Sequence, residues 1–269
     1  MLTQRVIACL DVKDGRVVKG TGFVNLRDAG DPIALAERYE AQGADEIVYL
    51  DISATDEGRS TLLDLVRRTA ERLFIPLTVG GGMRTVDDIA RALRAGADKT
   101  AINTAAVRRP LILGEAAARF GSQCVVVSID ALGKGSRWEV YVNGGREPTG
   151  IDAVEWAILC AKLGAGEILL TSIDRDGGRS GYDIDLTRAV SSAVQIPVVA
   201  SGGAGSAFDV VDVFQNGGAQ AALLAGILHD ETTDIRSVKS AVAASGIRVR
   251  GAAQRNARLA LRFPVPARR

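Results

Sequence analysis

The sequence has a single histidine, His229, in 269 residues. A Ser-His-Asp triad or a metal site with several histidines is therefore nearly excluded, and we expect neither a metal nor a cofactor. Aromatic residues make up 4% of the chain, and the formal net charge is +1. Little material is present for stacking nucleic acid bases, and the charge gives no reason to expect nucleic acid or membrane as a partner.

Cysteine is also scarce, and the three cysteines show no paired spacing. Cys9, Cys124 and Cys160 lie in apolar runs, which is typical of buried thiols in a reducing compartment. No apolar run reaches the length of a membrane span, and the start of the chain lacks a signal-peptide pattern. We therefore expect a cytoplasmic location.

The sequence is rich in short apolar runs that alternate with segments of helical length. Eight runs are candidate strands: 5–11, 46–52, 75–81, 98–104, 123–130, 167–174, 196–203 and 220–226. Nearly continuous apolarity is typical of parallel strands covered on both faces. The segments 31–43, 85–96 and 151–164 have the caps and periodicity of helices. The pattern predicts one (β/α)8 barrel over residues 1–250, with an open doubly wound sheet as the alternative. The basic tail 251–269 is expected to be disordered.

The two halves of the chain resemble each other. GADEIVYLDI (43–52) matches GAGEILLTSID (164–174), and IPLTVGGG (75–82) matches IPVVASGG (196–203). Such a repeat predicts a twofold axis, so that a group at one strand end has a counterpart across the barrel mouth.

Two glycine patches, VGGGMRT (79–85) and ASGGAGS (200–206), follow the third and seventh predicted strands and open helices. Glycine allows close backbone approach, and a helix N-terminus favours an anion, so each patch is a candidate phosphate site. One patch alone is equally consistent with a tight turn. Two patches at equivalent positions predict a long substrate with a phosphate at each end.

Asp11 and Asp130 end the first and fifth predicted strands, at equivalent positions of the repeat. We predict that they form an acid–base pair, the alternative being carboxylates that cap helices or pair with lysines. Asp51, Asp174 and Asp176 crowd the same end. Asp176 lies in a glycine-rich loop suited to substrate hydroxyls, whereas Asp51 is as consistent with orienting its neighbours. The segment 13–31 is longer than a minimal connection and is expected to close over the ligand. Lys19 lies within this segment, where it either meets an anionic substrate or is simply solvated.

Several stretches together resemble the cyclase subunit of imidazole glycerol phosphate synthase, from the N-terminus to about Arg250. They are CLDVKDGRVVKG (9–20), NLRDAGDP (25–32), LTVGGGMRT (77–85), AGADKTAINTAAV (95–107), GGREPTGIDAVEWA (144–157), LLTSIDRDG (169–177) and ASGGAG (200–205). The resemblance implies a (β/α)8 barrel of histidine biosynthesis that uses ammonia from a glutaminase subunit. It implies conversion of phosphoribulosyl-formimino aminoimidazole carboxamide ribonucleotide to imidazole glycerol phosphate and aminoimidazole carboxamide ribotide.

The resemblance also implies roles for individual residues. Asp11 and Asp130 become the general acid and base, and Lys19 the loop lysine. The first phosphate falls on Gly82, Asn103 and Thr104, and the second on Asp176, Gly177, Gly203, Ala225 and Gly226. Two positions depart from the family, since Gly226 stands where a serine is usual and Gly178 where a threonine is usual.

Four charged residues stand at the starts of the first, second, fourth and sixth predicted strands, on the face opposite the chemistry: Arg5, Glu46, Lys99 and Glu167. Taken alone they are consistent with simple salt bridges. The resemblance implies a ring through which ammonia enters the barrel, with the glutaminase docked on that face and Asp98 at the interface. An internal route would keep ammonia from being protonated in water.

Two other functions are consistent with parts of this pattern. The sister isomerase of the same pathway shares the duplicated barrel, the two aspartates and the two-phosphate substrate, but the segment 9–20 and the charged ring favour the cyclase. A barrel that only activates a glutaminase, without catalysis of its own, is the third hypothesis.

Overall fold

The computed structural model describes residues 3–21, 24–52 and 56–251, and of residues 19–21, 24–26 and 56–60 it describes only the main chain. The prediction of a disordered tail falls, beyond Gly251, outside the described residues. None of the helices in the described ranges is long and apolar enough to cross a membrane.

Eight parallel strands close into a barrel. They are β1 (Arg5–Lys13), β4 (Glu46–Asp51), β5 (Leu77–Gly80), β6 (Lys99–Ile102), β7 (Val125–Lys134), β10 (Glu167–Ser172), β11 (Val198–Ser201) and β12 (Ala221–Leu224). Each pairs with the next in this order, and β12 returns to pair with β1. The predicted (β/α)8 barrel is therefore confirmed, and the open-sheet alternative is wrong.

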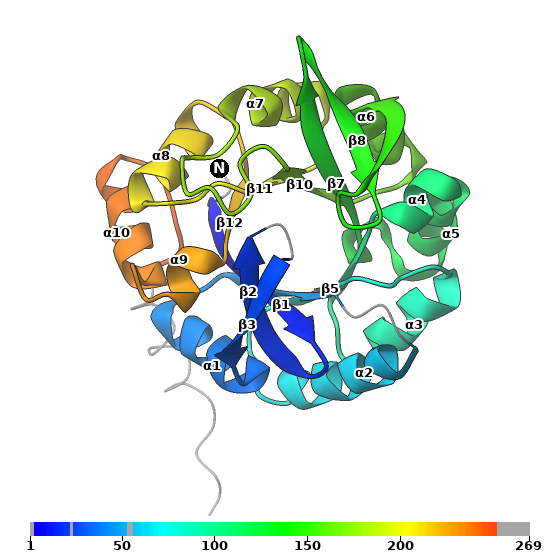
Figure 1. Cartoon of the computed structure of the whole chain (residues 1–269), viewed down its shortest axis with the longest axis horizontal. Helices are drawn as coiled ribbons and strands as arrows, with labels where there is room; N and C mark the ends of the chain where they lie inside the picture. Colours follow the sequence, from blue (N-terminus) through cyan, green and yellow to red (C-terminus); the bar gives the residue numbers. More distant parts are fainter. Residues whose placement is uncertain (1–2, 22–23, 53–55, 252–269) are drawn as a thin grey trace, which may run out of the picture.

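Helices form an outer ring around the strands (Figure 1). They are α1 (Pro32–Gln42), α2 (Asp56–Ala70), α3 (Val86–Ala95), α4 (Thr104–Arg108), α5 (Leu111–Phe120), α6 (Ala153–Leu163), α7 (Ile184–Ala193), α8 (Ala207–Gln215), α9 (Gly226–His229) and α10 (Ile235–Ala244). The predicted caps of α1 are present, because the Asp31 side chain accepts from the Ala34 amide and Gly43 adopts a left-handed conformation.

Two antiparallel hairpins extend the barrel strands, and neither was predicted. After β1 come β2 (Arg16–Thr21) and β3 (Val24–Gly30), and after β7 come β8 (Arg137–Val142) and β9 (Glu147–Asp152). The segment 13–31 is therefore largely paired strand rather than open loop. The turn that joins β1 to β2 lies at Asp14 and Gly15, both with positive φ, which is the backbone an Asp-Gly pair favours. Since β1 and β7 are equivalent in the repeat, the hairpins extend the internal symmetry.

Alternate residues of each barrel strand enter two separate apolar clusters. On β1, Val6, Ala8 and Leu10 pack outward under the helices. Ile7 and Cys9 point the other way and fill the barrel. Their inward partners from the other strands are Val48, Ala101, Val126, Leu169, Val199, Ala221 and Leu223. Burial on both faces explains why the strands read as continuous apolar runs. It leaves an apolar interior between two polar barrel ends.

Candidate active site

The carboxyl ends of the barrel strands, here called the mouth, carry two aspartates on opposite sides of the barrel. Asp11 lies in β1 and Asp130 in β7, with three barrel strands between them in either direction. Burial raises the pKa of Asp11 to about 7, and the negative charge of Asp176 adds to this. Burial likewise raises the pKa of Asp130 to about 6. Both carboxyl groups can therefore exchange protons near neutral pH.

Asp176, which follows β10, is electrostatically coupled to both of these aspartates. Burial is the largest cause of the raised pKa of Asp11, of Asp130 and of the Cys9 thiol inside the barrel. The negative charge of Asp176 raises each of these pKa values further. Burial raises the pKa of Asp176 itself, against a hydrogen bond from the Gly177 amide. The mouth thus holds three carboxyl groups that influence one another's protonation.

Asn103 and Thr104 follow β6 and contact the second hairpin and β7, the strand that this hairpin extends. Asn103 donates from Nδ2 to Asp130 at 2.9 Å and to the Tyr141 carbonyl at 3.3 Å. Thr104 Oγ1 accepts from the Asn143 amide at 3.0 Å. Because both side chains are engaged in these contacts, the main-chain amides at the start of α4 are the donors more readily offered to a ligand.

The two glycine patches have the same geometry. Gly81 and Gly202 lie 121 residues apart (202 − 81), and their φ values are 92° and 87°. A side chain at either would collide with main chain, since a Cβ would lie 2.1 Å from the Asp51 oxygen at Gly81 and 2.7 Å from the Ser172 oxygen at Gly202. Glycine is therefore required at both turns.

The helix that follows each patch is capped in the same way. Asp88 of α3 accepts from the amides of Arg84 and Thr85 at 3.0 and 2.9 Å. Asp209 of α8 accepts from the amides of Gly205 and Ser206 at 2.9 and 2.7 Å. These contacts hold each glycine turn against a helix N-terminus, where the remaining amides and the helix dipole favour an anion.

The other residues predicted for the second phosphate lie around the second patch. Gly203 accepts through its carbonyl from the Gly181 amide at 2.8 Å, which ties the loop after β10 to the patch. Ala225 and Gly226 begin α9 directly after β12, the strand next to β11. Gly177 lies in that same loop after β10 with φ 71°.

Three further residues that the sequence singled out, Asp174, Asp51 and Lys19, have surroundings of their own. Asp174 Oδ2 accepts from the Gly133 amide at 2.7 Å, so it anchors the loop to β7. The main chain of Asp51 forms the surface on which Gly81 packs. Lys19 lies in β2, where it is paired with Arg27, and its side chain is outside the described residues.

The amino-terminal end of the barrel holds the four charged residues as a closed ring of ion pairs. Arg5 pairs with Glu46 at 3.1 Å and also with Glu167. Lys99 Nζ pairs with the same two carboxylates at 2.8 and 2.7 Å. Burial alone would raise the pKa of Glu167, but the charges of Arg5 and Lys99 outweigh it and lower that pKa. Thr78, which was not predicted from the sequence, donates its hydroxyl to Glu46. Its place on β5, two residues before Gly80, marks it as inward-facing.

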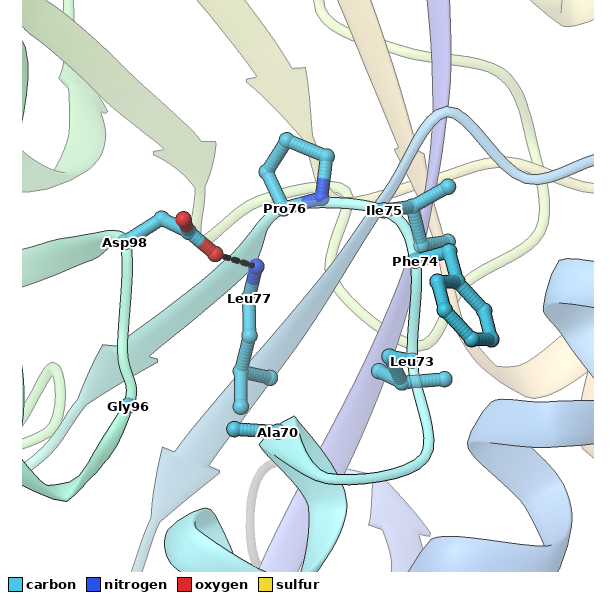
Figure 2. A pocket seen from close by; sticks show the side chains of 8 residues that line it. All are labelled: Ala70, Leu73, Phe74, Ile75, Pro76, Leu77, Gly96 and Asp98. Carbon is cyan, nitrogen blue, oxygen red and sulfur yellow. Dashed lines mark hydrogen bonds between the residues drawn. The ribbon is translucent and has the colours of Figure 1, made fainter. Parts of the chain in front are cut away.

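An open pocket of about 350 Å³ is lined by residues of the segments that lead into β5 and β6 (Figure 2). Its lining includes Asp98, which precedes the ring residue Lys99, and Phe74. Asp98 Oδ2 accepts from the Leu77 amide at 2.8 Å. Phe74 is 72% exposed, an unusual state for a phenylalanine.

Comparison with known proteins settles the family. The sequence model of the histidine biosynthesis protein family matches residues 5–234. The chain belongs to this family. It is 64% identical over 250 residues to the imidazole glycerol phosphate synthase subunit HisF of Myxococcus xanthus (strain DK1622), a match that covers 93% of this chain and 99% of that protein. The match therefore includes the strands that carry the two mouth aspartates and the charged ring.

Proposed function

We propose that this chain is the cyclase subunit of an imidazole glycerol phosphate synthase. In this reaction ammonia adds to the bis-phosphorylated substrate, and ring closure with carbon–nitrogen cleavage yields imidazole glycerol phosphate and aminoimidazole carboxamide ribotide. The family membership and the close relative support the reaction. The observation that carries the assignment of the site is the pair of aspartates with pKa values near neutrality, on opposite strands between two matching glycine patches.

Asp11 and Asp130 are assigned to proton transfer. A carboxyl group that is protonated near pH 7 donates to an oxygen that leaves as water, and an ionised one accepts a proton from the attacking nitrogen. Two sites, one at each patch, hold the phosphates. The first consists of Gly82, Asn103 and Thr104, and the second of Asp176, Gly177, Gly203, Ala225 and Gly226. Binding at both ends fixes the reacting atoms between the two carboxyl groups.

The interior of the barrel is assigned as the route for ammonia. Arg5, Ile7, Cys9 and Asp11 share the inward face of β1, so the ring and the reacting carboxyl lie six residues apart, or about 20 Å at the rise of a strand. The side chains between them belong to the apolar interior cluster. Apolar walls favour the neutral molecule over ammonium. Since four ion pairs close the ring, entry requires at least one of them to open.

The amino-terminal face is assigned as the docking surface for a glutaminase partner. Phe74 is exposed at this end, in the connection to β5, where it lines the pocket together with Asp98. An exposed aromatic side chain next to a pocket is the kind of anchor that protein interfaces use. A glutaminase seated there would release ammonia at the ring.

The sister isomerase is the second candidate, because the aspartate pair would serve it equally. The closed ring of ion-paired charges at the amino-terminal end favours the cyclase, since an isomerisation consumes no ammonia.

The test supplies the purified chain with the bis-phosphorylated substrate and ammonium salt at alkaline pH. The proposal expects imidazole glycerol phosphate from the unmodified chain and a loss of about 10² to 10⁴ in rate for Asp11→Asn and Asp130→Asn, with partner binding retained. Isomerisation of the aminoaldose precursor without ammonia would instead identify the sister enzyme. Partner activation without turnover would identify a scaffold.

A further inference from the structure

We infer that Arg179 is a ligand of the second phosphate, held on Asp230 until substrate arrives. This inference rests on the proposed function and adds a side-chain cation to a site so far described by main-chain donors. Arg179 lies in the loop between β10 and α7 and pairs with Asp230, the residue that ends α9.

The main chain of Arg179 lies directly on the second glycine patch. A Cβ at Gly205 would be 2.2 Å from the Arg179 carbonyl oxygen and 3.2 Å from the Arg179 Cβ. Gly205 is therefore the residue that lets this loop approach. Arg179 itself has φ 51°, a left-handed conformation that is uncommon for residues other than glycine.

The guanidinium reaches across the patch to Gly226. Its Nη2 lies 3.5 Å, and its Nε 3.9 Å, from the point where a Cβ at Gly226 would stand. Arg179 thus spans the predicted second phosphate site, with its main chain at Gly205 and its charged head at Gly226. Gly226 has no side chain, so the guanidinium lies where this chain offers a ligand no hydroxyl.

The pair with Asp230 is suited to exchange. The side chains are 44% and 31% exposed, and an exposed ion pair of this kind contributes little to stability. A phosphate dianion offers more charge and more acceptor oxygens than one carboxylate, and arginine binds it through two parallel hydrogen bonds. When a phosphate binds the amides of the patch, the guanidinium exchanges Asp230 for it.

The experiment compares four variants in the ammonia-dependent reaction. Arg179→Ala should raise KM by about tenfold to a hundredfold and leave kcat little changed, because it removes uniform binding of a group remote from the chemistry. Arg179→Ala combined with Gly226→Ser should recover part of this loss through the hydroxyl. Arg188→Ala, which removes an exposed arginine of α7 that pairs with Asp185, controls for the change in net charge.

Asp230→Asn separates a ligand from a structural ion pair. If Arg179 binds phosphate, removing its competitor leaves KM unchanged or lowers it. If the pair only holds the loop, Asp230→Asn raises KM as Arg179→Ala does, and the inference is overturned. An unchanged KM for Arg179→Ala also overturns it. Absence of product from the unmodified chain would count against the proposed function instead.

Discussion

Asn103 and Asp130 are joined by a hydrogen bond of 2.9 Å that links the ends of β6 and β7. Burial raises the pKa of Asp130, whereas this bond lowers it because it stabilises the ionised carboxylate.

Asn103→Ala should therefore raise the pKa of Asp130 above its value of about 6. The acid limb of the pH profile of kcat/KM should move to higher pH, by up to about one unit. Thr104→Ala is the matched control, because Thr104 begins the same helix and bonds Asn143. A limb that stays in place in Asn103→Ala, or that moves equally in both variants, would contradict this role.

Asp11→Asn should stabilise the protein at alkaline pH. The folded-state pKa of about 7 lies above the ordinary value of 3.8, so the folded chain binds more protons between these values and loses stability as pH rises through them. Up to roughly 4 kcal/mol of unfolding free energy is at stake. Urea denaturation at pH 5 and pH 8.5 should show a larger gain for the variant at pH 8.5. Equal gains at both values would refute the shift.

Alanine at either patch glycine should destabilise the fold beyond the strain of its backbone. Gly81→Ala and Gly202→Ala force a Cβ against main chain, whereas Gly246, with φ 79°, has open space around it. Gly246→Ala should cost roughly 1–2 kcal/mol for its left-handed conformation. The two patch variants should lose about 1–3 kcal/mol more by denaturant titration, from the steric overlap. Equal losses in all three variants would mean that the contacts with Asp51 and Ser172 are not tight.

Lys99→Met should strongly destabilise the amino-terminal ring. Glu46 and Glu167 are 3% and 8% exposed, and the substitution leaves Arg5 as their remaining cation in the ring. Breaking a buried pair in this way costs about 3–5 kcal/mol. Lys134→Met is the control, since Lys134 is 51% exposed and pairs with Glu139, and it should cost at most about 1 kcal/mol. Similar midpoints of thermal unfolding for both variants would argue against a tightly closed ring.

Phe74→Asp should weaken binding of the glutaminase by at least about tenfold and leave ammonia-dependent turnover unchanged. Phe208→Asp is the matched control, because Phe208 is 80% exposed but lies near the start of α8, at the other end of the barrel. Calorimetric titration measures both affinities. If Phe208→Asp weakens binding and Phe74→Asp does not, the partner docks elsewhere.

The sequence by itself determined the barrel and the positions along the chain of the two aspartates and the two glycine patches. The apolar runs are continuous because each strand is buried on both faces, and that property is local. Asp11 and Asp130 occupy equivalent positions of the repeat, as do Gly81 and Gly202, so their equivalence could be predicted without coordinates. The hairpins β2–β3 and β8–β9 escaped prediction because their short strands mix polar and apolar residues and form by pairing across the chain. β2 and β8 pair with β1 and β7, and β3 and β9 pair with β2 and β8.

Only the tertiary structure decided which groups act on one another. The charge of Asp176 reaches Asp11 and Asp130 because barrel closure brings the end of β10 close to strands distant in sequence. The guanidinium of Arg179 lies over Gly226 because the loop after β10 packs closely on Gly203 and Gly205, which have no side chains. A pKa or a contact depends on distances between segments, and a sequence carries spacing along the chain but not distance across it.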